Sequence, residues 1–236
     1  MNVLRVGLSA LTIAATVGVS GLANATLILA SAVPHVTNGG FETTTATGKD
    51  KFLGKVTGWS GGSNLTFIDF PGTADNGTDL SVYGPFPSTS PSGGNFVEAD
   101  GDPQYSSAIT QTIDNLTPGQ PYTLTFQQAA GQQAGFTGPT TERWKVSFGS
   151  DSKLSTLFSL PQGGVGAWQT ETMVFVATLA SQVLSFLAVG TPNGAPPISF
   201  LDGVSLTAVP EPASMALLGA GLLGVGFIRM RRQPKA

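Results

Sequence analysis

The feature that most constrains the fold is a series of short alternating segments between residues 26 and 208, where no helical period runs for three turns. In residues 122–127 and 143–148, large apolar side chains alternate with polar ones, which is typical of a strand with one dry and one wet face. Turn residues such as Pro118-Gly119 separate the segments. Strands are predicted at residues 65–70, 95–99, 108–113, 122–127, 143–148, 154–160, 168–177, 183–189 and 198–206. About nine or ten strands in one domain predict an all-β fold, a single jelly-roll β-sandwich.

Composition supports an all-β domain and excludes other classes. Charged residues make up 11% of the chain, against about 25% in ordinary soluble domains, and there are 31 Gly and 16 Pro residues among the 236. A hydrophobic content of 41% excludes a disordered chain. A long helix-rich enzyme is disfavoured, because so many turn-forming residues would interrupt its helices.

Few residues are available for catalysis or tight metal binding. The chain has no cysteine, which excludes disulfides, thiolate metal sites and cysteine nucleophiles. A Ser-His-Asp triad or a zinc site would have to use His35, the only histidine. Residues 26–208 hold thirteen acidic and six basic residues, so this segment favours cations and excludes nucleic acid as a partner.

The first 25 residues have the three parts of a secretory signal peptide. Arg5 precedes an apolar run over residues 6–22, and small residues at Ala23 and Ala25 form a site for signal peptidase. Cleavage is expected after Ala25, which makes the protein an exported one. The alternative is a retained membrane anchor.

The last 28 residues form a second segment outside the predicted sandwich. Pro210, Glu211 and Pro212 precede an apolar stretch at 213–228, which is near the short limit for a membrane-spanning helix. The basic tail, 229–236, contains Arg229, Arg231 and Arg232 and is expected to stay in the cytoplasm as a stop-transfer signal. The alternative, a buried core helix, leaves this arginine cluster unexplained.

This C-terminal segment, 209–236, resembles the PEP-CTERM sorting signal of Gram-negative bacteria in the order and spacing of its three parts. The resemblance implies processing by an exosortase, a membrane-embedded protease or transpeptidase. It also implies transient anchoring in the inner membrane, followed by delivery to the cell surface or extracellular matrix. We expect the tail to be removed from the mature protein.

The ectodomain, 26–208, is similar to the galactose-binding-like jelly rolls found among carbohydrate-binding modules. The similarity lies in short stretches that follow the order of that family, at residues 38–42, 58–59, 109–111, 118–119, 122–126 and 201–206. It implies a β-sandwich without catalytic residues, which often holds a structural calcium ion. It identifies no ligand-binding residue, because such folds also serve as plain adhesion or matrix modules.

Glu42 and Asp202 match the positions from which related modules supply calcium ligands. Hard cations take several oxygens, from carboxylates and from carbonyls that a glycine-rich turn such as 38–40 can present. The hypothesis is one structural calcium ion, with no other cofactor. The alternative is that Glu42 is solvated and Asp202 caps a turn.

The densest acidic cluster lies at residues 98–102. Strand alternation sends Glu98 and Asp100 to one face, and Asp102 follows in a turn. Paired carboxylates can perform glycosidase chemistry or bind a cation. A solvated strand end is the favoured interpretation, because charge runs are usually exposed, and the cluster is not predicted to be an active site.

Aromatic side chains in the loops are the other candidates for a sugar site, since a sugar ring stacks on an exposed aromatic plane. Burial is the favoured interpretation for each of them, and for the strand residues Trp144 and Trp168. The loop candidates are Trp59, Tyr83, Phe86, Tyr105 and Phe136, with Gln127, Gln128, Gln132 and Gln133 close to Phe136 in sequence.

Three functions remain open at this point. The first is an exported, non-enzymatic surface or matrix protein whose sandwich interacts with extracellular polysaccharide. The second is a purely structural or adhesive module. The third is a secreted hydrolase, which is disfavoured by the single histidine and by the lack of a Gly-x-Ser-x-Gly nucleophile motif.

Overall fold

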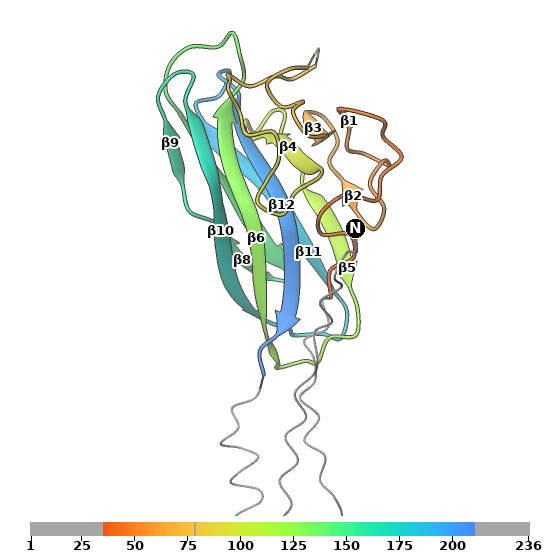
Figure 1. The fold of residues 1–236 in the computed structure, drawn as a ribbon. Helices are drawn as coiled ribbons and strands as arrows, with labels where there is room; N and C mark the ends of the chain where they lie inside the picture. Colours follow the sequence, from red (N-terminus) through yellow and green to blue (C-terminus); the bar gives the residue numbers. More distant parts are fainter. Residues whose placement is uncertain (1–34, 78, 211–236) are drawn as a thin grey trace, which may run out of the picture. The chain divides into compact units, whose positions relative to one another are not determined.

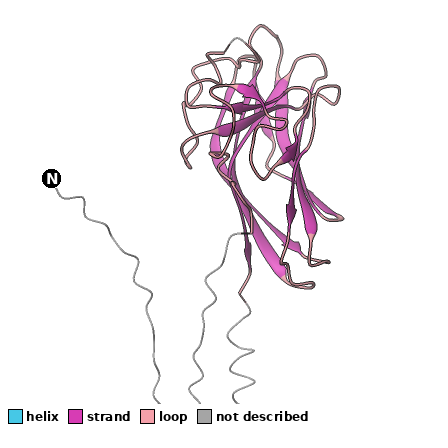
Figure 2. Cartoon of the chain, turned by 90° about the vertical axis from the view of Figure 1, so that its right-hand side faces the viewer, coloured by secondary structure: helices cyan, strands magenta, loops and turns pink. Residues whose placement is uncertain are grey.

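The computed structural model of the chain describes residues 35–77 and 79–210, which form two packed β-sheets (Figures 1 and 2). One, the β12 sheet, has the order β1-β3-β4-β12-β6-β10; the other, the β11 sheet, has the order β2-β5-β11-β7-β8, with β9 also paired to β7. The strands are β1 (Asp50–Lys51), β2 (Ser60–Gly61), β3 (Thr66–Asp69), β4 (Phe96–Asp100), β5 (Ile109–Ile113), β6 (Pro121–Gln132), β7 (Thr140–Phe148), β8 (Asp151–Leu154), β9 (Phe158–Leu160), β10 (Val165–Val176), β11 (Gln182–Thr191) and β12 (Pro197–Ala208). These residues contain no helix, so the prediction of an all-β sandwich is confirmed.

The main core lies between the two sheets and follows from the alternation seen in the sequence. Leu124 and Phe126 in β6 are buried against the β11 sheet, where Phe186 is also fully buried. Phe186 packs edge-on against Phe126 and Trp144, with ring centroids 5.2 and 6.1 Å apart. Thr125, between the two buried β6 residues, is only half-buried, as the predicted dry and wet faces require.

A second core covers part of the outer face of the β12 sheet. The segment 70–95, between β3 and β4, places Phe86 over Phe200 in β12, with ring centroids 4.2 Å apart. Phe67 and Phe96 from β3 and β4 complete the cluster. Because this segment lies over one face and the β11 sheet over the other, every residue of β3 and β4 is buried.

The strand count and one strand boundary differ from the prediction. The described residues form twelve strands, two of them of two residues. The predicted strand 154–160 is wrong, because Leu154 ends β8 and Phe158 begins β9. The Ser155 amide still donates to the Trp144 carbonyl at 2.9 Å, but the Trp144 amide donates to Oγ of Ser155 at 2.8 Å, and the ladder ends there. The Ser155 hydroxyl also donates to Oε1 of Gln128 at 2.6 Å, so an inward polar contact interrupts the strand.

No helix among the described residues is long and apolar enough to cross a membrane. The predicted signal peptide 1–25, the apolar segment 213–228 and the basic tail 229–236 lie outside the described residues. Of the sorting motif, Pro210 is described and exposed, whereas Glu211 and Pro212 lie outside as well. β12 ends at Ala208, two residues before Pro210.

Candidate functional site

The turn at residues 38–41 packs directly onto β12. Val204 donates its amide proton to the Gly39 carbonyl at 2.9 Å. A Cβ at Gly39 would lie 1.9 Å from the Val204 carbonyl oxygen, so only glycine allows this approach. β12 shifts register against β6 between Asp202 and Ser205, and Gly203 within that shift has a φ of 59°. The irregularity turns Asp202 towards the 38–41 turn.

Glu42 and Asp202 both lie close to Gly40. A Cβ at Gly40 would lie 3.8 Å from Oδ1 of Asp202 and 3.9 Å from Cγ of Glu42. Glu42 is exposed, and its Oε1 accepts the Asn95 amide proton at 2.8 Å. Asp202 is fully buried and accepts hydrogen bonds from the Ser90 hydroxyl and from the Gly203 amide, the latter at 2.6 Å. The structure thus brings the two candidate ligands together. It also shows Asp202 capping a turn through the Gly203 amide, as the alternative interpretation expects.

The electrostatics around Asp202 favour a positive charge nearby. Burial raises the pKa of Asp202, the hydrogen bonds from Ser90 and Gly203 lower it, and the Glu42 carboxylate adds a smaller increase; the net value is about 7. In the described part of the chain, no group of three or more His, Cys, Asp or Glu residues could hold a metal ion. Glu42 and Asp202 offer carboxylate oxygens, the ligand type that hard cations such as calcium prefer.

The acidic cluster at 98–102 is not a solvated strand end, so that prediction is wrong. Glu98, Asp100 and Asp102 are all buried, because the segment 70–95 covers this face of β4. Asp100 accepts the Asp102 amide proton at 2.8 Å, and Asp102 accepts the Gly194 amide proton at 2.7 Å. Burial raises the pKa of Asp100, the Asp102 amide lowers it, and the Asp102 charge adds a smaller increase; the net value is about 6. Asp100 and Asp102 thus stabilise the local backbone by accepting amide hydrogen bonds.

Most loop aromatics are packed rather than available to a sugar. Trp59 is 5% exposed and donates its indole proton to the Asn38 carbonyl at 3.0 Å, and Phe86 is buried in the second core. Tyr83 is half-buried and donates its hydroxyl proton to the Phe136 carbonyl at 2.9 Å. Tyr105 is the exception, with an exposed fraction of 43%. The interpretation of these residues as packing residues is confirmed for Trp59 and Phe86.

The nearby glutamines divide between buried and open positions. Gln128 and Gln132 are fully buried, and their side-chain amides donate hydrogen bonds to backbone carbonyls. Gln128 donates to the Thr156 carbonyl at 3.1 Å, and Gln132 donates to the Gly138 carbonyl at 3.1 Å. Gln133 is half-buried beside the loop. Gln127, in contrast, faces out and donates to the Thr170 hydroxyl at 3.0 Å.

β10, β6 and β12 are adjacent strands of the β12 sheet (Figure 1). Their open face, here called the threonine face, carries mainly hydroxyl and amide side chains, together with Val174, which pairs with Thr123 and is 46% exposed. Its central residue, Thr125, pairs with Thr172 on one side and with Ser205 on the other. Its polar members are Thr123, Thr125 and Gln127 in β6, Thr170 and Thr172 in β10, and Ser205 and Thr207 in β12. All are exposed or half-buried, and none is ionisable. The sequence predicted the wet face of β6, but not which strands extend it.

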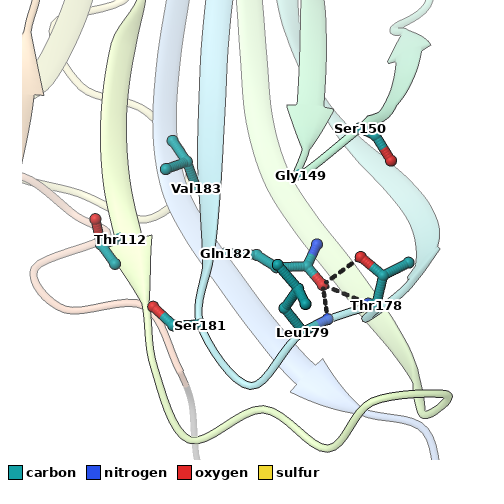
Figure 3. Close-up of a pocket in the computed structure, with 8 residues that line it drawn as sticks. All are labelled: Thr112, Gly149, Ser150, Thr178, Leu179, Ser181, Gln182 and Val183. Carbon is teal, nitrogen blue, oxygen red and sulfur yellow. Dashed lines mark hydrogen bonds between the residues drawn. The ribbon is translucent and has the colours of Figure 1, made fainter.

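A hollow of about 520 Å³ lies at one end of the β11 sheet, lined by β5, the start of β11 and the turn between β7 and β8 (Figure 3). Thr112 and Val183 line it, and the Gln182 side chain closes part of it. Oε1 of Gln182 accepts amide protons from Thr178 and Leu179, the latter at 2.8 Å. Its lining residues include no acid, base or histidine, so the hollow holds no catalytic constellation.

Comparison with solved structures finds similar β-sandwiches at low identity. The carbohydrate-binding module TmCBM61, in complex with beta-1,4-galactotriose, is 16% identical, with a TM-score of 0.44, covering 75% of this chain and 99% of that one. The CBM22-1 xylan-binding domain from Paenibacillus barcinonensis Xyn10C is 12% identical, with a TM-score of 0.37 and coverage of 76% and 95%. The enzymatically active domain of bacteriophage CBA120 tailspike protein 4 is 12% identical, with a TM-score of 0.37 and coverage of 75% and 21%. Likenesses this weak carry nothing about ligand or activity.

The comparison with curated proteins found no match. A protein family does match the end of the chain: residues 208–232 match the PEP-CTERM protein-sorting motif. The match begins at the last residue of β12, so the signal follows the sandwich without a linker domain. Residues 208–232 are therefore a PEP-CTERM protein-sorting motif, and the chain is an exported protein with a C-terminal sorting signal.

Proposed function

We propose that this chain is a non-enzymatic protein of the bacterial surface or extracellular matrix, whose sandwich binds extracellular polysaccharide through the threonine face. The observation that carries the proposal is the sorting motif at 208–232, joined directly to an all-β domain. In this proposal, residues 1–25 are a cleaved signal peptide, 213–228 anchor the chain in the inner membrane, and an exosortase acts at the motif. We also propose that the sandwich is a jelly roll.

The chemistry of the threonine face supports a sugar polymer as its ligand. Its hydroxyl and amide groups can donate and accept hydrogen bonds, as sugar hydroxyls also do. They repeat across strands about 4.8 Å apart, which is suited to an extended chain rather than to a small molecule. Because none of the face residues is ionisable, neither a neutral nor an acidic polymer is repelled by them.

A hydrolase is less well supported than a binding module. His35 packs edge-on against Tyr122, with ring centroids 5.2 Å apart, and has no serine or acidic hydrogen-bond partner among the described residues. The buried acids Asp100 and Asp102 bind backbone amides. The alternative function that remains is a structural or adhesive module without glycan binding.

Replacing both Thr125 and Thr172 with valine is expected to weaken polysaccharide binding about tenfold, because two hydrogen bonds of roughly 0.5–1.5 kcal/mol each are lost without a change of shape. Binding isotherms against neutral and acidic extracellular polysaccharides measure the effect. The matched control is Thr112→Val, an exposed threonine of the β11 sheet that should leave binding unchanged. If the unmutated protein shows no saturable binding to any polymer, the structural module is the better account.

The sorting tail is expected to be absent from the mature protein, because the motif is processed at the membrane. The intact mass of protein recovered from the producing cells should lack residues 213–236. Replacing Pro210, Glu211 and Pro212 with alanine should leave the tail attached and the protein in the membrane fraction. Lys235→Ala serves as the control and should be processed normally. A mature mass that includes the tail contradicts this part of the proposal.

We also propose that Glu42 and Asp202 hold one structural calcium ion, without any catalytic role. The arrangement supports this, because a buried carboxylate and an exposed one face the same glycine turn and raise each other's energy when both are ionised. A divalent cation between them would replace this repulsion with attraction. The Ser90 hydroxyl, which already contacts Asp202, is a further oxygen close to the site.

A further inference from the structure

Three side chains from neighbouring strands meet beneath the segment 70–95: Lys49, Asp69 and Glu98. Asp50 pairs with Ile68, so Lys49, one residue before β1, lies beside Asp69 at the end of β3. Phe67 pairs with Glu98, which places Glu98 on the same face of β4 and next to Asp69. This face is the one that the second core covers, so the three polar groups share an apolar surrounding.

The three side chains are sealed from water. The Lys49 side chain is 7% exposed, and those of Asp69 and Glu98 are 0% exposed. The Lys49 ammonium donates to Oε2 of Glu98 and to the Leu80 carbonyl, and it lies 5.6 Å from the centroid of the Phe67 ring. Nζ is 3.4 Å from Oδ1 of Asp69.

The charges of the group do not balance, and several of its atoms lack partners. One lysine faces two carboxyl groups, and among the described residues both oxygens of Asp69 and Oε1 of Glu98 have no hydrogen-bond partner. Burial raises the pKa of Asp69, and the Lys49 charge only partly offsets it. Burial raises the pKa of Glu98 well above its usual value, and the Asp69 charge raises it further. Both acids are therefore held towards their protonated forms beside the Lys49 side chain.

We propose that Lys49 and Asp69 condense spontaneously into an intramolecular isopeptide bond, with Glu98 as the proton acceptor and donor of the reaction. A neutral amine held about 3–3.5 Å from a carboxyl group in a dry site is in position to attack it. Burial also favours the protonated, uncharged forms of Asp69 and Glu98, which helps the acid to accept attack.

The step balances without any co-reactant. When the proton shared by the two acids is on Asp69, the Lys49 ammonium passes one proton to the Glu98 carboxylate, and the Nζ lone pair then attacks Cγ of Asp69. The C–N bond forms, the C–O bond to the Asp69 hydroxyl breaks, and Nζ loses its second proton to that leaving oxygen through Glu98. The products are one amide, one water molecule and a protonated Glu98, so atoms and charge are conserved.

The bond would fasten a weak part of the fold. β1 has only two residues and lies at the edge of the β12 sheet, where strands fray and pair with other chains. An amide from Lys49 to Asp69 would close the chain between β1 and β3 into a covalent loop, which restricts the unfolded chain as a disulfide does. The cysteine-free sequence provides no disulfide for this purpose.

Peptide mass analysis of the full-length chain, digested after denaturation, tests the proposal. We expect the peptides carrying Lys49 and Asp69 to remain joined, with a combined mass lower by one water molecule. Glu98→Gln should yield the two peptides separately, because glutamine cannot accept the amine proton. Asp69→Asn should still yield the joined peptide with the same mass, because the side-chain amide condenses with loss of ammonia.

Asp50→Asn is the matched control and should leave the joined peptide unchanged, since Asp50 pairs with Lys55 at the surface. Folding of each variant is checked by the fluorescence of its tryptophans, of which Trp144 is fully buried. Separate, full-mass peptides from the folded unmutated protein would overturn the proposal and leave a buried ion pair. A joined peptide in which Lys49 is bound to Glu98 would overturn the assignment of Asp69.

Discussion

Replacing Glu142 with glutamine is expected to stabilise the domain by about 3 kcal/mol at pH 8, with almost no effect at pH 4. Glu142 lies in β7 with its side chain fully buried between the sheets, and neither of its carboxyl oxygens has a hydrogen-bond partner among the described residues. Burial raises its pKa to about 8, against a weaker opposing effect of Thr140. Glutamine keeps the shape of the side chain and removes the charge that must be buried at high pH.

The sign of this effect follows from where the proton is bound. Between the ordinary glutamate pKa of 4.5 and the folded value of about 8, the folded state holds a proton on Glu142 that the unfolded chain has released. The stability that this bound proton contributes is therefore fully present below pH 4.5 and is lost as the pH rises towards 8. The full shift corresponds to more than 4 kcal/mol at about 1.4 kcal/mol per pKa unit, and about 3 kcal/mol allows for local relaxation and water entry.

Denaturant unfolding of the unmutated protein and of Glu142→Gln, measured from pH 4 to pH 9, checks this prediction. The difference between the two free energies of unfolding should grow with pH and level off near pH 8. Asp151→Asn, at an exposed position in β8, is the control and should change stability by less than about 0.5 kcal/mol at every pH. A Glu142→Gln curve parallel to the unmutated curve would show that Glu142 is not protonated in the folded state.

Calcium is expected to raise the melting temperature of the unmutated domain by roughly 5–10 °C at pH 8. A ligand present at 100 times its dissociation constant stabilises the native state by about 2.7 kcal/mol, and about 1 kcal/mol shifts the midpoint of a domain of this size by roughly 2–4 °C. At pH 5 the response should vanish, because the pKa of Asp202 is raised to about 7 and its carboxyl group is then protonated.

Asp202→Asn separates calcium binding at this site from a general effect of salt on stability. The variant should lose the calcium response at pH 8, yet in EDTA it should be more stable than the unmutated protein, since it no longer buries a charge beside Glu42. Asp75→Asn, at another acidic position in the 70–95 segment, should retain the calcium response. Scanning calorimetry with calcium and with EDTA provides the measurement. Equal melting temperatures of the unmutated protein under both conditions would rule out the calcium site.

Much of the sandwich could be predicted because alternation is a local property. Tyr122, Leu124 and Phe126 are buried, and the polar residues between them are not, as a two-residue period requires. The strand 154–160 was predicted wrongly for an equally physical reason: Ser155 prefers two inward hydrogen bonds to the straight ladder that its neighbours favour. A contact with Gln128, distant in sequence, cannot be read from local pattern.

The carboxylates show the same limit more sharply. Glu98 and Asp100 were predicted to be solvated because charge runs usually are. They are buried because Leu80, Val82 and Phe86, which lie in a segment without strand or helix periodicity, fold over β4. Nothing in the alternation of β4 indicates that both of its faces are covered.

The sequence by itself determined the β class, the shortage of catalytic residues and the sorting motif at 208–232, because each depends on residue type and spacing along the chain. Only the tertiary structure decided which strands extend the threonine face, that Asp202 meets Glu42, and that Lys49 is enclosed with two acids. These depend on strand order and on the path of the segment 70–95, which are set by burial of apolar surface from distant parts of the chain.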